Sequence, residues 1–195
     1  AESFLGSISP LSEAEADALL AFIKAGNGAI IVADGSFSFG ETAQSFVDPF
    51  DADVGRSSSE TPSPSTIIDP LSNPISNGPF GLITSYFTER THVTGAFYDL
   101  GPYAIPIGQI DGTSEASIAY VPENGFMPGS GRIVLFSDAD TGLASIENDD
   151  GLLLNAIAYA AVPVPEPNSL ALAGMGFLAF ATAAARSRGK VAKLT

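Results

Sequence analysis

The C-terminal end of the chain constrains its organisation more than any other part. Residues 169–185 are seventeen residues without a charged side chain, rich in Ala, Leu, Phe and Gly. As a helix rising about 1.5 Å per residue, this run spans roughly 26 Å, close to the roughly 30 Å hydrocarbon core of a bilayer. Basic residues follow at once and favour the cytoplasmic side. We therefore predict a transmembrane helix at 169–185 and a basic cytoplasmic tail at 186–195, with a membrane stop formed by Arg186, Arg188 and Lys190.

A short proline-rich linker, residues 163–168, lies directly before this run. Pro165 and Pro167 cannot continue a helix and hold the chain extended, so Glu166 is presented where a processing enzyme can reach it. The order of motif, apolar span and basic end resembles the PEP-CTERM sorting signal of exported bacterial proteins. The resemblance implies an exosortase that cuts near the motif, and a permanent single-pass anchor is the alternative. The sorting motif consists of Val164, Pro165, Glu166 and Pro167.

The residues before the linker, 1–162, form the predicted body, which is strongly acidic. All 22 acidic residues of the chain precede Pro167, against four basic ones, which leaves a net charge of −18. Such a charge repels nucleic acid and anionic lipid, so we expect no nucleic-acid partner. It suits an exported protein that meets cations or polysaccharide.

The N-terminal end bears on export as well. Residue 1 is Ala, and no charged-then-apolar signal peptide opens the chain. An exported protein needs such a signal, so we expect that it was removed or that the sequence is a fragment. Residues 3–8 read like the end of a strand whose beginning is missing.

Two apolar runs stand out in the body. In the first, Ser12 and Glu15 form a capping box that opens a helix ending near Gly26, and residues 29–33 then read as a strand buried on both faces. The second, residues 132–136, is another buried-strand candidate, followed by a helix over about residues 150–161. Leu153, Ile157 and Ala160 are expected to mark the inner side of this last helix.

The middle of the body gives weaker signals. Residues 56–65 are rich in Ser, Pro and Thr and are predicted to be an exposed loop. Residues 80–87, 104–110 and 116–121 are consistent with short strands. The phenylalanines at 37, 39, 46 and 50 are expected to pack in the core, with a sugar-stacking patch as the alternative.

The order of these segments resembles the class I glutamine amidotransferase-like domains, in their exported non-catalytic branch. The resemblance implies an α/β fold: a flavodoxin-like, mainly parallel sheet with helices on both faces, N-terminally incomplete here. The enzymes of that class use a Cys nucleophile and a His. This chain has no Cys, and its single histidine, His92, has no matching motif around it. We therefore expect that the chain is not an enzyme.

Three aspartates are candidate metal ligands. Asp34 and Asp138 each follow an apolar strand, where ligands gather in open α/β sheets, and Asp140 lies two residues further on. Together they could supply oxygen ligands for Ca²⁺. The alternative is that they are turn residues at strand ends, with no cofactor. Arg132, which follows Gly131, could bind an anion, although a surface arginine leading into a strand explains it as well.

Together these patterns predict a bacterial cell-envelope or extracellular-matrix protein with a cleavable C-terminal signal. We expect a precursor in the inner membrane and a product at the cell surface or outside the cell. The predicted partners are an exosortase-type enzyme, the membrane and polysaccharide, and the family resemblance implies a non-enzymatic role in exopolysaccharide or biofilm. A calcium- or ligand-binding module, or a hydrolase on an amidotransferase-like fold, are the alternatives.

Overall fold

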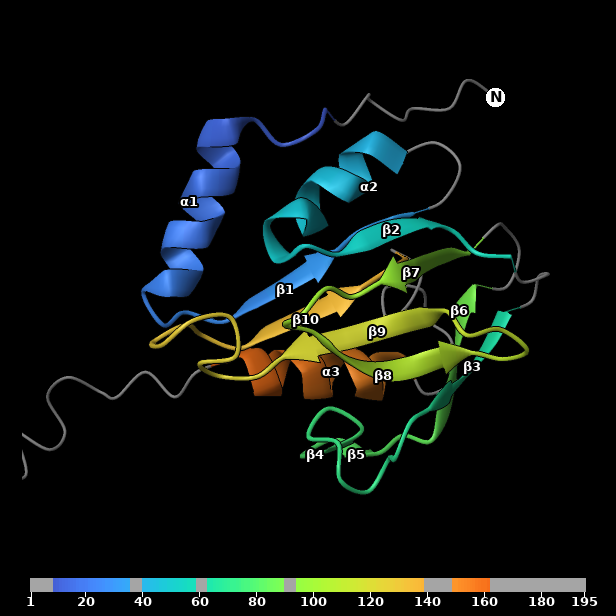
Figure 1. Ribbon diagram of the computed structural model, residues 1–195. Helices are drawn as coiled ribbons and strands as arrows, with labels where there is room; N and C mark the ends of the chain where they lie inside the picture. The colour runs from blue at the N-terminus through green and yellow to red at the C-terminus, as the bar shows by residue number, and fades with distance from the viewer. Residues whose placement is uncertain (1–8, 36–39, 59–62, 90–93, 139–148, 162–195) are drawn as a thin grey trace, which may run out of the picture. The chain divides into compact units, whose positions relative to one another are not determined.

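The computed structural model describes residues 9–35, 40–58, 63–89, 94–138 and 149–161 (Figure 1). All of them belong to one compact unit, Ala1–Val162. The predicted linker, transmembrane helix and basic tail lie outside the described residues. Within the described ranges, no helix is long and apolar enough to cross a membrane.

The first helix, α1 (Glu13–Lys24), begins and ends where the sequence predicts. Ser12 is its N-cap: the Glu15 N–H donates to Ser12 Oγ at 3.4 Å, and the Ser12 N–H donates to Glu15 Oε2 at 2.8 Å. The predicted capping box is therefore confirmed. Gly26 follows the helix with φ +87°, a left-handed conformation that glycine adopts without a steric penalty.

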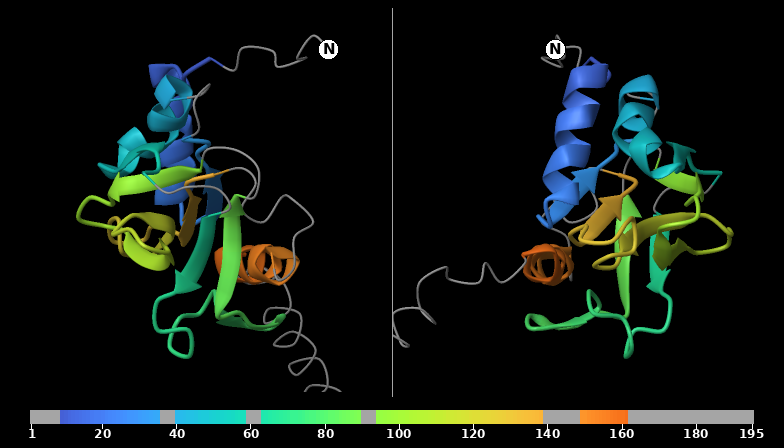
Figure 2. Two further views of the ribbon diagram at one scale, coloured as in Figure 1. Left: turned by 90° about the vertical axis from the view of Figure 1, so that its right-hand side faces the viewer. Right: turned by 60° about the vertical axis from the view of Figure 1, so that its left-hand side comes forward.

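Eight of the described strands form one curled sheet, two others form a separate hairpin, and the fold is mixed α/β (Figures 1 and 2). The path through the sheet is β1-β10-β9-β8-β3-β6, while β7 pairs with β9 and β2 pairs with β7. The bounds are β1 (Ala29–Val32), β2 (Asp53–Arg56), β3 (Ser63–Ile67), β6 (Ser85–Glu89), β7 (Gly95–Asp99), β8 (Ile105–Ile110), β9 (Ala116–Val121) and β10 (Ile133–Phe136).

The prediction of a mainly parallel, flavodoxin-like sheet is wrong for the described residues. Only β1 and β10 pair in parallel there, and each of the other pairings in this sheet is antiparallel. The physical reason is the length of the connections. A parallel pair needs a crossover of a dozen residues or more, whereas β8 and β9 are joined by residues 111–115 alone. That turn contains Gly112 at φ +78°.

Helices cover both faces of the β1–β10 pair, as predicted. Side chains alternate along a strand, so Ile31 and Leu135 face one cluster while Ile30 and Val134 face the other. The first cluster includes residues of α1 and of α2 (Gly40–Val47). The second includes Leu152, Ala156 and Ala160 of α3 (Asp149–Ala160).

The middle of the chain is more ordered than the sequence predicts. Phe50, in the 3₁₀ helix η1 (Asp48–Phe50), is fully buried and meets the ring of Phe126 edge-on, with the centroids 5.6 Å apart. It belongs to the core, and Phe46 packs against the same cluster, whereas residues 37 and 39 lie outside the described residues. The exposed loop predicted at 56–65 is wrong at both ends, because Arg56 lies in β2, and Ser65 lies in β3 and is buried.

The predicted last helix is confirmed as α3, and its predicted inner side is right for Ala160 but wrong for Ile157. Leu152, Ala156 and Ala160 are the buried apolar residues, whereas Ile157 is 46% exposed. The helix is apolar nearly all round, so the sequence did not reveal which face is buried. Its phase is set by Asn155, which is fully buried and bonds the small hairpin of β4 (Asn77–Gly78) and β5 (Gly81–Leu82).

Candidate functional site

The carboxyl ends of β1 and β10 bring two of the three predicted metal ligands to one edge of the sheet. The strands pair in register from Ala29 with Ile133 to Val32 with Phe136. The pairing continues beyond the strands, since the Gly35 N–H donates to the Ser137 carbonyl at 2.9 Å. Asp34 and Asp138 therefore follow neighbouring strand ends.

Asp138 binds the start of β7. Its side chain is 3% exposed, and Oδ2 accepts a hydrogen bond from the Gly95 N–H at 2.6 Å. The Ser137 hydroxyl donates to the Gly95 carbonyl at 2.8 Å. The approach is so close that a Cβ on Gly95 would lie 2.0 Å from the Ser137 carbonyl oxygen. Ser137 and Asp138 therefore hold both backbone polar groups of Gly95 and fix β7 against the strand ends.

The predicted calcium site stays a prediction. Asp140 and the lone histidine, His92, lie outside the described residues. Among the residues that are described, no three or more His, Cys, Asp or Glu side chains are grouped so that they could hold a metal ion. The geometry supports the turn interpretation for Asp138, because one of its carboxylate oxygens already accepts a backbone hydrogen bond.

A second polar group lies where β2 ends and β9 begins. The Ser58 N–H donates to both oxygens of the Glu115 carboxylate at 3.2 Å, and the Ser58 hydroxyl donates to Oε1 at 2.8 Å. The Ser57 hydroxyl donates to Oε2 of the same carboxylate. The Ser57 N–H in turn donates to the Thr94 carbonyl at 2.8 Å. These bonds fasten the end of β2 to the start of β9.

Four buried hydroxyls form a chain that the sequence did not suggest. Tyr86 bonds Ser117, Ser117 donates to Ser65 at 3.4 Å, and Ser65 bonds Thr88. A nucleophilic serine needs an adjacent base. The neighbours of the Ser117 hydroxyl in these bonds are two other hydroxyls, neither of which is a base at neutral pH. The chain therefore satisfies buried polar groups across β3, β6 and β9. The one feature of the sequence that could have indicated this chain is a hydroxyl residue within an apolar strand, such as Ser117 in β9.

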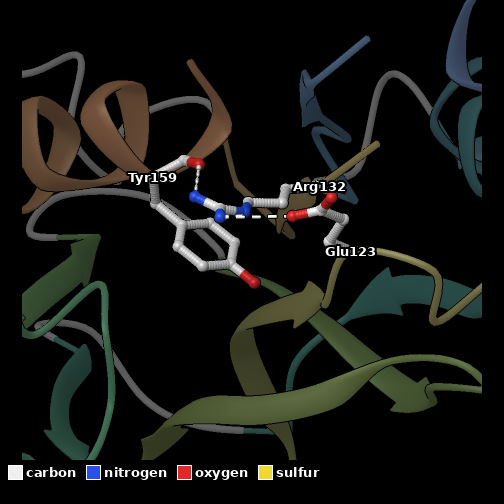
Figure 3. A network of polar contacts seen from close by, with 3 residues as sticks. All are labelled: Glu123, Arg132 and Tyr159. Atoms are coloured by element: carbon white, nitrogen blue, oxygen red, sulfur yellow. Dashed lines mark hydrogen bonds and ion pairs between the residues drawn. The ribbon is translucent and has the colours of Figure 1, made fainter. Parts of the chain in front are cut away.

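Arg132 is bound to the C-terminal turn of α3 (Figure 3). Its Nη1 donates to the Tyr159 carbonyl and its Nη2 to Glu123 Oε2, both at 3.3 Å, and the guanidinium lies 5.3 Å from the centroid of the Tyr159 ring. A cation is favourable at a helix C-terminus, where the carbonyl groups point outward. Burial, and then Tyr120, raise the pKa of Tyr159 to about 12. This geometry supports a structural role for Arg132 rather than anion binding.

The comparisons with known proteins identify the C-terminal signal. The PEP-CTERM protein-sorting motif matches residues 163–188. The match includes Val164, Pro165, Glu166 and Pro167, as well as Arg186 and Arg188, and ends before Lys190. No curated protein and no solved structure matches the chain. The amidotransferase-like resemblance of the body is therefore not confirmed.

The matched motif supports an exported protein with a C-terminal sorting signal, an exosortase substrate. It implies processing by an exosortase and a membrane-anchored precursor that is exported to the cell surface. The motif residues themselves lie outside the described part of the structure.

Proposed function

We propose that residues 1–162 are a non-enzymatic surface domain that is retained in the exopolysaccharide matrix after an exosortase has processed the C-terminal signal. The observation that carries the proposal is the order of parts along the chain. A folded acidic body ends with α3 at Ala160, and the sorting motif begins at residue 163. In this arrangement the C-terminal tail directs sorting, and residues 1–162 are the part that is delivered.

The non-enzymatic role is supported by how the polar groups are used. The carboxylate of Asp138 holds β7, that of Glu115 holds the end of β2, and the Ser117 hydroxyl bonds other hydroxyls. Each of these side chains is hydrogen-bonded to another part of the fold, whereas a catalytic group would have to contact a substrate. The chain also has no Cys, so the covalent route of an amidotransferase is closed to it.

The matrix role is supported by charge. The chain before Pro167 carries a net charge of −18, so the body is repelled by nucleic acid and by other anionic surfaces, and it stays soluble outside the cell. Hydrated polysaccharide, met directly or through cations, is a partner that such a surface can approach. The family resemblance of the signal points to the same setting.

Mass spectrometry of the protein from its native envelope tests the processing step. We expect a mature C-terminus between Pro165 and Asn168, and we expect Glu166→Ala to leave the chain uncut. Asp150→Ala is the matched control, because it removes an exposed acidic residue at the start of α3 without touching the motif. A mature protein that retains Arg186 and Arg188 would establish a permanent anchor instead.

Extraction of the exopolysaccharide matrix tests whether the mature protein is retained there. The mature protein should remain with washed polysaccharide and should be released when the polysaccharide is digested enzymatically. A body that washes out freely, with or without that digestion, would remove the matrix role while leaving the sorting step intact.

A further inference from the structure

The outward face of α3 carries apolar side chains that the fold leaves exposed. Leu154 and Ile157 are 41% and 46% exposed, although three other apolar residues of the helix are fully or nearly buried. A helix that is apolar all round is normally covered on all sides. In α3, the sheet covers only the side that includes Leu152, Ala156 and Ala160.

The β4–β5 hairpin extends this apolar surface. Phe80 and Leu82 are 53% and 47% exposed. The hairpin is fixed to α3 because Asn155 Oδ1 accepts from the Phe80 N–H at 2.9 Å and Asn155 Nδ2 donates to the Gly81 carbonyl at 3.0 Å. Figures 1 and 2 show the hairpin lying beside α3 in each view. The four side chains Phe80, Leu82, Leu154 and Ile157 are called the α3–hairpin face below.

The segments that form this face carry few charges: the hairpin has none, and α3 has only Asp149 and Asp150, both in its first turn. No Asp, Glu, Lys or Arg occurs among residues 70–88 or among residues 151–165, whereas the chain before Pro167 carries 22 acidic residues. Most of the body's surface is therefore repelled by an anionic surface, and this face, with Asp150 at the start of the helix, is repelled less. A surface with few charges and several exposed apolar side chains is typical of an interaction site.

We propose that the α3–hairpin face rests on the surface of the phospholipid bilayer in the membrane-anchored precursor. Two residues, 161 and 162, separate α3 from the sorting motif in the sequence, so α3 is the described element that precedes the anchored segment most closely along the chain. Repulsion of the acidic remainder by anionic lipid orients the same face toward the bilayer. Apolar side chains on such a face enter the boundary between headgroups and acyl chains. The inference rests on the sorting signal and is independent of the matrix role.

Tryptophan fluorescence of the full chain in vesicles tests the proposal. The chain has no Trp, so a single substitution gives an unambiguous probe. In vesicles of phosphatidylethanolamine and phosphatidylglycerol, brominated acyl chains should quench the emission of Leu82→Trp about twofold, because such faces insert roughly 5–10 Å. Phe22→Trp is the matched control. Phe22 is 50% exposed on α1, which contributes to the other core cluster, and its emission should be unchanged.

Further variants and a soluble quencher separate the possible outcomes. In the Leu82→Trp chain, Leu154→Asp together with Ile157→Asp should abolish quenching, with circular dichroism confirming that the body is folded. Resistance to carbonate extraction shows that the chain is anchored. If an anchored chain has Leu82→Trp emission that is quenched no more than that of Phe22→Trp, the inference is overturned and the anchor is not. Protection of Leu82→Trp from acrylamide without quenching by brominated lipid would assign the face to a second copy or another protein. Extraction of the chain by carbonate would overturn the anchor and this inference together.

Discussion

Asp138 Oδ2 accepts a hydrogen bond from the backbone N–H of Gly95 at 2.6 Å, although the two residues are 43 positions apart in the chain. The bond joins the end of β10 to the start of β7, and both groups are buried. A buried donor that loses its acceptor pays the full cost of its desolvation. This contact should therefore contribute measurably to the stability of the body.

Replacing Asp138 with Ala should destabilise the body by about 1 to 3 kcal/mol, because the Gly95 N–H would be left without this acceptor. Asp138→Asn keeps an oxygen in the same place and should cost less. Urea denaturation of a chain ending at Val162, the end of the compact unit, measures both variants. Equal stability of Asp138→Ala and the unchanged chain would mean that the bond contributes nothing.

Gly95 should not tolerate a side chain. A Cβ there would lie 2.0 Å from the Ser137 carbonyl oxygen, so Gly95→Ala should cost at least about 1 to 3 kcal/mol through overpacking. Gly40, the first residue of α2, has nothing within 4 Å of its Cβ position. Gly40→Ala should be neutral or stabilise by up to about 1 kcal/mol. Thermal unfolding of the two variants gives the comparison, and a similar effect at both positions would contradict it.

The parts of the fold that could be predicted are those whose signals are local. The capping box at Ser12, the stop near Gly26 and the apolar runs of β1 and β10 all depend on residues close together in the chain. The antiparallel order of the middle strands depends on pairings between distant segments, which alternation of side chains does not reveal. The prediction of the buried face of α3 was right for Ala160 but wrong for Ile157, because apolar residues lie on nearly all sides of the helix and the buried Asn155 faces the hairpin.

The candidate site was predictable to a similar degree. That Asp34 and Asp138 follow strand ends could be read from the apolar runs before them. That Asp138 binds Gly95, and that Ser57 and Ser58 bind Glu115, could not, because these contacts join segments more than forty residues apart. The sorting signal was the part most open to prediction, since its motif, span and basic residues are consecutive.

Removing the α1 cap should destabilise the body. Ser12→Ala removes the acceptor of the Glu15 N–H and should cost about 0.5 to 2 kcal/mol. Ser12→Asn is the matched control, because Asn is also a preferred N-cap residue and should restore most of the loss. Helix content and urea denaturation measure the effect. Equal losses for Ala and Asn would show that capping is not the cause.

The same cap predicts a pH dependence. The Ser12 hydroxyl, and then the Ser12 backbone N–H, lower the pKa of Glu15 below its usual 4.5. A carboxyl group with a lowered pKa stabilises the fold above its unfolded-state pKa, and that contribution is lost as the pH falls through the lowered value. Between neutral pH and about pH 3, Ser12→Ala should therefore lose less stability than the unchanged chain. Parallel pH curves for the two proteins would contradict the assignment.

Calcium should not bind at the strand ends. A hard cation takes six to eight oxygen ligands in proteins, and one oxygen of Asp138 is already used by Gly95. Calorimetric titration of the chain ending at Val162 should show no heat of binding. Heat that disappears when Asp34→Asn and Asp138→Asn are combined would assign the calcium site to these residues and favour a ligand-binding module.

The apolar run of the tail should be sensitive to a single charge. Phe177 lies near the centre of residues 169–185. Arginine at the centre of a spanning helix costs about 2.5 to 3.5 kcal/mol in translocon-mediated insertion, so Phe177→Arg should strongly reduce the inserted fraction. Phe177→Leu is the matched control and should insert as the unchanged chain does, because both side chains are apolar. Insertion that is indifferent to Phe177→Arg would mean that this segment does not cross the bilayer, and the anchor would then have to lie elsewhere in the precursor.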